Sequence, residues 1–142
     1  MSKVILVTGP ARSGKSEWAE ALANQSNKKV VYIATALVSP DDKQWQQRII
    51  QHRNRRPQSW ITLEAPFDLS VTLCDAKPDI VMLVDSLGTW VANNIDKDDA
   101  SWLDIVEEFL ETVQLVAAEM IFVAEETGWG VVPAYPVGQT FR

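Results

Sequence analysis

The chain has 142 residues and a formal net charge of −6; 46% of its residues are hydrophobic and 23% are charged, which excludes a chain that is disordered by default. Its longest apolar runs are far shorter than the roughly 20 residues of a membrane span, no signal-peptide pattern follows Met1, and its one cysteine, Cys74, allows no internal disulfide. We therefore expect one soluble, cytoplasmic domain over residues 1–142, without a membrane span.

The first elements in chain order alternate between strand and helix patterns. A short β-branched run predicts a strand over 4–7, and apolar residues at helical spacing predict a helix over 15–24. A second buried strand is expected over 30–33. A helix with one packed face is then expected over 41–56, because Pro57 stops it.

The second half of the chain continues this alternation. Its expected elements are a strand over 60–63, a helix over 66–74, a strand over 80–84, a helix over 99–118 and a strand over 120–123, before a tail at 128–142 without clear periodicity. The run at 80–84 is apolar throughout, which is typical of a strand covered on both faces of a parallel sheet. The pattern implies an α/β fold with a mainly parallel sheet that binds ligands at the carboxyl ends of its strands.

A phosphate-binding loop is the clearest motif. Residues 9–16 match G-x-x-x-x-G-K-[ST] between the first strand and the first helix. In such a loop we expect the N–H groups to surround phosphate oxygens, Lys15 to add charge at the terminal phosphates, and the Ser16 hydroxyl to join a Mg²⁺ shell. The alternative is a turn that only connects strand to helix, but such a turn would not demand Lys and Ser here. The predicted binding residues are Gly9, Pro10, Ala11, Arg12, Ser13, Gly14, Lys15 and Ser16.

Asp85 directly follows the apolar run at 80–84. A carboxylate at the carboxyl end of a strand, beside the phosphate loop, can hold Mg²⁺ directly or through water. The alternative is an N-cap for a following helix, because Asp and Ser both favour that position. We predict that Asp85 and Ser16 contribute to a metal site.

The basic residues concentrate around the one histidine, His52. Residues 43–56 include five basic side chains and no acidic one, whereas residues 96–126 include ten acidic side chains and one lysine. A local basic cluster in an acidic chain suits a small polyanion such as a nucleotide and disfavours nucleic-acid partners. Neighbouring arginines would keep the His52 ring neutral and nucleophilic. A structural histidine at the end of a solvated basic helix is the alternative, and charge does not separate the two.

Several stretches together resemble one known family. They are TGPARSGKS at 8–16, YIATA at 32–36, HRNRRP at 52–57, WITLEAP at 60–66, LVDSLGTW at 83–90 and GWGVVP at 128–133. In order and spacing they closely resemble the bifunctional adenosylcobinamide kinase and adenosylcobinamide-phosphate guanylyltransferase family of cobalamin synthesis. The resemblance covers essentially the whole chain, and its histidine–arginine element is far more specific than the phosphate loop.

The resemblance implies two activities. In the first, ATP or GTP phosphorylates adenosylcobinamide, with Lys15 at the γ-phosphate and Mg²⁺ as cofactor. In the second, His52 attacks the α-phosphorus of GTP, and adenosylcobinamide phosphate takes the GMP to give adenosylcobinamide-GDP. The nucleotide-site residues that the resemblance adds are Ala34, Thr35, Ala36, Arg53, Asn54, Arg55, Arg56, Glu64 and Asp85. Alternatively, Glu64 is a helix-start residue and 34–36 is a tight strand exit.

The family also implies a fold and an assembly, namely a RecA-like P-loop NTPase three-layer sandwich in a homotrimer. Its members continue past the end of this chain by several tens of residues, so the family's last helix and strand are expected to be missing. Two alternatives remain open. One is a P-loop kinase of another small-molecule class with a structural His52, and the other is a non-catalytic nucleotide-binding module.

Overall fold

A computed structural model describes residues 3–10, 13–37, 43, 47, 57, 59–74 and 76–125. The elements in chain order are β1 (Val4–Gly9), α1 (Lys15–Gln25), β2 (Lys29–Ala34), β3 (Ile61–Glu64), α3 (Leu69–Cys74), β4 (Ile80–Asp85), α4 (Leu87–Asn93), α5 (Asp99–Leu115) and β5 (Glu119–Glu125). Of the helix expected over 41–56 the structure describes residues 43 and 47, both helical. The rest of that helix and the tail at 128–142 lie outside the described residues.

The five expected strands are confirmed, and so are the helices near 15–24, 66–74 and 99–118. The last two are shorter than expected, since α3 begins at Leu69 and α5 ends at Leu115. Helix α4 was not predicted. It has seven residues, and its Gly, Thr and Val content gives low helix propensity, so it is held by its N-cap: the Ser86 side chain accepts a hydrogen bond from the Thr89 N–H.

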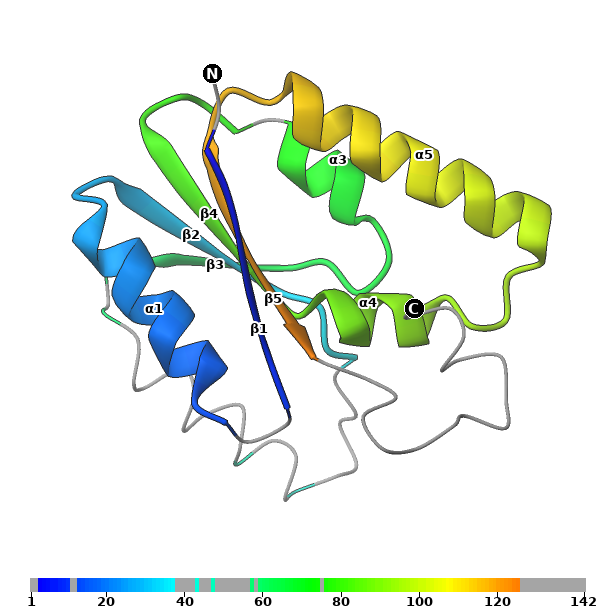
Figure 1. The fold of residues 1–142 in the computed structure, drawn as a ribbon, viewed down its shortest axis with the longest axis horizontal. Coiled ribbons are helices and arrows are strands. Elements are labelled where there is room, and N and C mark those ends of the chain that lie inside the picture. Colours follow the sequence, from blue (N-terminus) through cyan, green and yellow to red (C-terminus); the bar gives the residue numbers. More distant parts are fainter. Residues whose placement is uncertain are drawn as a thin grey trace.

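The strands form one five-stranded sheet in the order β1-β5-β4-β2-β3. Each neighbouring pair is parallel, so the carboxyl ends of all five strands lie at the same end of the sheet. Figure 1 shows α1 on one face of the sheet and α3, α4 and α5 on the other, which makes three layers. The expected α/β fold with a parallel sheet is therefore confirmed.

Alternation along the strands divides the interior into two cores. One set of strand residues, such as Met82, Val84 and Phe122, packs against α3, α4 and α5. The intervening set, such as Val81 and Leu83, packs against α1. Because successive side chains of a strand point to opposite faces, each buried strand supplies both cores.

Two alanines are the buried residues of α1 where the helix packs on the sheet. Ala19 and Ala23 are both fully buried, in the core that also holds Val7 and Leu83. Small side chains let the helix approach the strands closely. The helix and the loop before it are therefore set directly on the sheet.

Strand β1 lies at one edge of the described sheet. It pairs with β5, and the exposed fractions of Val4 and Leu6 are 48% and 58%. Within the described part of the chain, no helix has the length and apolar character that crossing a membrane requires.

Candidate functional site

The phosphate loop leaves β1 at Gly9 and enters α1 at Lys15. A Cβ atom on Gly9 would lie 2.7 Å from Ser13 Oγ, closer than real Cβ contacts allow. Gly14 has φ of +83°, a left-handed conformation that side chains disfavour. The local geometry therefore explains why both fixed positions of the motif, 9 and 14, are occupied by glycine.

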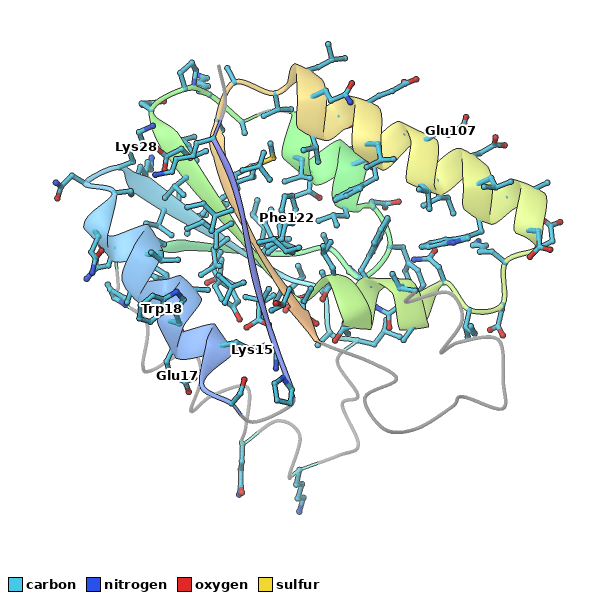
Figure 2. The ribbon with its side chains drawn as sticks, in the orientation of Figure 1. Lys15, Glu17, Trp18, Lys28, Glu107 and Phe122 are labelled. Atoms are coloured by element: carbon cyan, nitrogen blue, oxygen red, sulfur yellow. The ribbon has the colours of Figure 1, made fainter. Side chains whose placement is uncertain are left out.

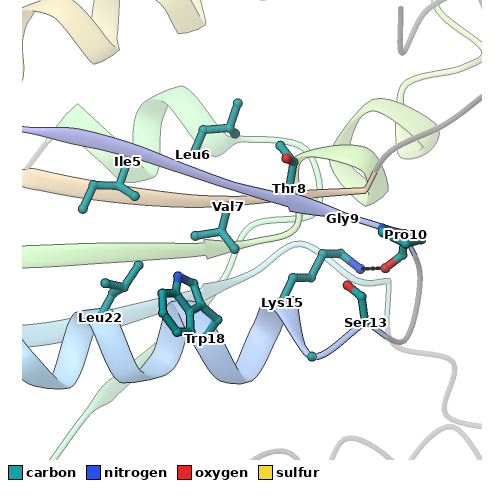
Figure 3. Close-up of a pocket in the computed structure, with 11 residues that line it drawn as sticks. Ile5, Leu6, Val7, Thr8, Gly9, Pro10, Ser13, Lys15, Trp18 and Leu22 are labelled. Carbon is teal, nitrogen blue, oxygen red and sulfur yellow. Dashed lines mark hydrogen bonds between the residues drawn. The ribbon is translucent and has the colours of Figure 1, made fainter.

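The lysine of the loop folds back over it. Lys15 Nζ donates a hydrogen bond to the Pro10 carbonyl oxygen at 3.2 Å, as Figure 3 shows. This contact is exposed. The ammonium group therefore lies at the mouth of the loop, where it can exchange a neutral carbonyl for phosphate oxygens.

The start of α1 is open to an anion. Its N-cap is Gly14, which makes no side-chain capping bond, and the first helical hydrogen bond runs from the Trp18 N–H to the Gly14 carbonyl at 3.0 Å. The first N–H groups of a helix need partners and carry partial positive charge. Ser16, in this first turn, is half-buried.

An open groove of about 690 Å³ continues from the loop between β1 and α1. The loop residues line one end, and the apolar residues Ile5, Leu6, Trp18 and Leu22 line the rest. Figure 3 shows Trp18 and Leu22 on α1 facing β1 across this groove. Polar and apolar walls thus meet beside the phosphate loop.

Asp85 ends β4 and lies on the same face of the sheet as α1. It is in register with Ala34 on β2, which is in register with Glu64 on β3, and on its other side with Val123 on β5. Val123 is level with Val7 on β1, two residues before Gly9. Since Val7 and Val123 belong to the α1-side core, Asp85, Ala34 and Glu64 lie on that face too.

Asp85 and the phosphate loop are not on adjacent strands, because β5 lies between β1 and β4. Two strand spacings separate them, about 10 Å. Asp85 is half-buried and Glu64 is exposed. Across this spacing Asp85 would contact a metal ion held at the loop directly or through water, with phosphate oxygens in the same shell.

Tyr32 is a site residue to which the sequence pattern assigns no role. Its hydroxyl donates to Asp85 Oδ2 at 2.8 Å, and the ring is buried in the α1-side core. The two residues are 53 positions apart. No local pattern could have predicted this pair.

The alternative roles of Asp85 and Glu64 are wrong. Ser86, and not Asp85, is the N-cap of α4. Glu64 ends β3, and the following helix starts at Leu69. The two carboxylates therefore stand at strand ends, where a parallel sheet presents its ligand-binding edge.

Thr35 is fully buried at the exit of β2. Its hydroxyl donates to the Ser86 carbonyl at 2.8 Å and accepts from the Ser86 N–H at 2.8 Å. Asn93 of α4 donates to the Thr35 carbonyl at 2.8 Å and to the Pro66 carbonyl at 3.0 Å. These bonds tie the exits of β2, β3 and β4 together, so the Thr35 side chain holds the loops in place. Ala34 and Ala36 are half-buried beside it.

The remaining predicted residues lie outside the described part of the chain. They are Ala11, Arg12, His52, Arg53, Asn54, Arg55 and Arg56. The structure thus places the phosphate loop, Asp85, Ala34 and Glu64 at the carboxyl end of the sheet and on one face, with Glu64 on β3, at the opposite side of the sheet from β1.

Solved structures support the fold. The crystal structure of the RadB recombinase matches with a TM-score of 0.55 at 17% identity, and the match covers 97% of this chain and 70% of that one. This likeness, together with the phosphate loop between β1 and α1 of a parallel sheet, supports a P-loop NTPase fold. At this identity the likeness shows the fold alone.

Curated relatives share the sequence as well. The bifunctional adenosylcobalamin biosynthesis protein CobP of Pseudomonas aeruginosa is 45% identical over 130 residues, which cover 90% of this chain and 74% of that protein. The bifunctional adenosylcobalamin biosynthesis protein CobU of Escherichia coli is 35% identical over 155 aligned positions, covering 98% of this chain and 83% of that protein.

A family model adds a match over most of the chain. The model, described as cobinamide kinase / cobinamide phosphate guanyltransferase, matches residues 5–142. With the phosphate loop in place and two curated relatives above 30% identity, the chain belongs to the bifunctional cobinamide kinase and cobinamide phosphate guanyltransferase family.

Proposed function

We propose that this chain phosphorylates adenosylcobinamide with ATP or GTP and then transfers GMP from GTP to adenosylcobinamide phosphate, giving adenosylcobinamide-GDP. The observation that carries the proposal is the phosphate loop with Asp85 on the same face of the sheet, in a chain that matches this family over residues 5–142. The loop binds the triphosphate that both steps consume.

In the kinase step the loop and Lys15 bind the β- and γ-phosphates, and the cobinamide hydroxyl attacks the γ-phosphorus. A bond forms from that oxygen to phosphorus while the bond to the bridging oxygen breaks. The nucleoside diphosphate leaves, and the hydroxyl proton passes to water. Lys15 gives up its 3.2 Å bond to the Pro10 carbonyl for the phosphate charge. Catalysis of this kind rests on positioning and charge.

Ser16 and Asp85 are the proposed Mg²⁺-binding residues. Among the described residues there is no group of three or more His, Cys, Asp or Glu side chains that could hold a metal by itself. Mg²⁺ bound to nucleotides commonly uses one or two protein oxygens and takes the rest from phosphate and water. The donor set of one hydroxyl and one carboxylate fits that use. When bound, Mg²⁺ supplies neutralisation of charge on the transferred phosphoryl group.

In the transferase step His52 is the proposed nucleophile. Its ring nitrogen bonds to the α-phosphorus of GTP as pyrophosphate leaves, which gives a guanylylated histidine. An oxygen of adenosylcobinamide phosphate then bonds to the same phosphorus, the P–N bond breaks, and the ring is free again. The support is the match of the 52–57 element to the family and its three arginines, which favour a neutral ring.

The nucleotide contacts proposed for Ala34, Ala36, Arg53 to Arg56 and Glu64 also follow from the resemblance. Thr35 contributes by holding the loop, since its hydroxyl is already bonded to Ser86. We further propose that the protein forms a homotrimer, which the family resemblance supports. We also propose a cytoplasmic location, because a single exposed cysteine, Cys74, suits a reducing compartment.

Incubation with α-labelled GTP tests the covalent step. We expect protein-bound GMP that is acid-labile and alkali-stable, absent in His52→Ala and reduced in Lys15→Met. An intact protein that binds GTP without forming the adduct favours a P-loop kinase of another small-molecule class. A protein that binds GTP without consuming cobinamide or releasing pyrophosphate is a binding module. Either result removes the transferase proposal.

A further inference from the structure

The hydrogen bond from Tyr32 to Asp85 gives the carboxylate a fixed orientation. We infer that Tyr32 is a positioning residue, whose hydroxyl holds the Asp85 carboxylate in the orientation that the Mg²⁺–nucleotide complex requires. The inference rests on the proposed function of Asp85. The bond is 2.8 Å long, and the exposed fraction of Tyr32 is 6%.

The strand register explains how the tyrosine reaches the carboxylate. Tyr32 is level with Leu83, while Asp85 is level with Ala34, two residues farther along both strands. Tyr32, Ala34 and Asp85 share the α1-side face, so the tyrosine must extend along its strand past Ala34. The small side chain of Ala34 leaves room for the tyrosine to reach Asp85, and diagonal pairs of this kind are within reach of aromatic side chains.

The tyrosine ring is held by its surroundings. It belongs to the α1-side core together with Ala19, Ala23 and Leu83. A ring packed in this way has few rotamers available, so its hydroxyl is a fixed point for the carboxylate. The packing of Tyr32 under α1 thus helps to fix the orientation of the Asp85 carboxylate at the end of β4.

A positioned carboxylate still has capacity for a cation. Ionised Asp has two oxygens and about four acceptor sites, and one tyrosine hydroxyl occupies one of them. Residues that hydrogen-bond to a metal ligand commonly change metal affinity by about 10- to 100-fold when they are removed. Because Mg²⁺ here is also held by phosphates, we expect an effect near the lower end, about tenfold.

The test compares nucleotide binding with and without Mg²⁺. A fluorescent GTP analogue is titrated into wild-type protein and Tyr32→Phe, in Mg²⁺ and in EDTA, and the Mg²⁺ concentration at half-maximal binding is measured. We expect Tyr32→Phe to require about tenfold more Mg²⁺ and to bind equally well in EDTA. The matched control is Thr112→Val, which removes a buried hydroxyl bonded to the Glu108 carbonyl at 2.8 Å on α5, and should leave the Mg²⁺ requirement unchanged.

A double-mutant cycle separates positioning from general packing. If Tyr32 acts through Asp85, the Mg²⁺ requirement of Asp85→Asn is already raised and Tyr32→Phe adds nothing to it. Additive effects, an unchanged Mg²⁺ requirement in Tyr32→Phe, or equal loss of binding in Mg²⁺ and EDTA would each overturn the inference. Tyr32→Met, which also fills the core without a hydroxyl, serves if the Phe variant does not fold.

The outcomes also distinguish the two levels of the argument. Wild-type protein that does not bind the nucleotide at all contradicts the proposed function and the inference with it. Wild-type protein that binds with a Mg²⁺ requirement that Tyr32→Phe does not change leaves the proposed function standing and removes the inference alone.

Discussion

Thr35 and Ser86 exchange two hydrogen bonds across the exits of β2 and β4. The Thr35 hydroxyl donates to the Ser86 carbonyl and accepts from the Ser86 N–H, each at 2.8 Å, and both residues are buried. One hydroxyl therefore satisfies both main-chain polar groups of the residue that follows Asp85. The chain directly after the Asp85 carboxylate is therefore fixed by the side chain that follows another strand, β2.

Thr35→Val is expected to destabilise the protein. The valine keeps the shape of threonine but leaves the buried Ser86 N–H without its acceptor, which costs about 1–3 kcal/mol. The midpoint of urea unfolding should fall. Thr35→Ser, which keeps the hydroxyl, is the matched control and should lose less. Equal midpoints for wild-type and the valine variant would show that the two bonds contribute little.

Lys15→Met should weaken nucleotide binding by roughly 10- to 100-fold, because a charge-assisted bond to phosphate contributes about 1.5–3 kcal/mol. Stability should change little, since the contact of Lys15 with Pro10 is exposed. Isothermal titration with GTP measures the affinity. Lys28 is the control: it pairs with Glu119 at 3.3 Å, and Figure 2 shows it at the far end of α1 from Lys15. Lys28→Met should bind GTP normally.

Gly14→Ala should lower stability by roughly 1–2 kcal/mol because of the backbone alone. The added Cβ would be no closer than 3.9 Å to its nearest neighbour, Glu17 Oε2, so the cost comes from φ of +83° and not from a clash. Gly14→Asn should lose less, since Asn tolerates the left-handed region better. Thermal unfolding of the two variants checks this order, and the reverse order would contradict it.

The N-cap of α5 predicts a pH dependence. The Asp98 carboxylate accepts a bond from the Ser101 N–H at 2.7 Å, and this bond, with a second to the Ser101 side chain, lowers the pKa of Asp98. A carboxylate with a lowered pKa in the folded state stabilises the protein above its unfolded-state pKa. This stabilisation is lost as the pH falls through the folded-state pKa. At pH 7 the midpoint of urea unfolding should therefore be higher for the wild-type protein than for Asp98→Ala. The difference between the two midpoints should shrink below about pH 4. A difference independent of pH would contradict this account.

The strands and the longer helices could be predicted because their evidence is local. The apolar run at 80–84 and the helical spacing of 99–118 both lie within one element, and the phosphate loop is a contiguous motif. Helix α4 could not be predicted in this way. Its seven residues span about two turns, which is too short for a periodic pattern.

The order of the strands and the contacts of the site depend on distant residues. The alternation of strands and helices does not say that β5 lies between β1 and β4, so it could not predict how far Asp85 lies from the phosphate loop. The bonds Tyr32–Asp85 and Thr35–Ser86 join residues 53 and 51 positions apart. Local patterns report on neighbours in sequence and carry no information on such pairs.

The two buried alanines of α1 limit which substitutions this enzyme can accept during evolution. Ala19 and Ala23 are fully buried in the α1-side core, so their small side chains let the helix lie close to the strands. A bulkier residue at either alanine would push α1 away from the sheet. The phosphate-binding start of the helix would then move away from the Asp85 carboxylate.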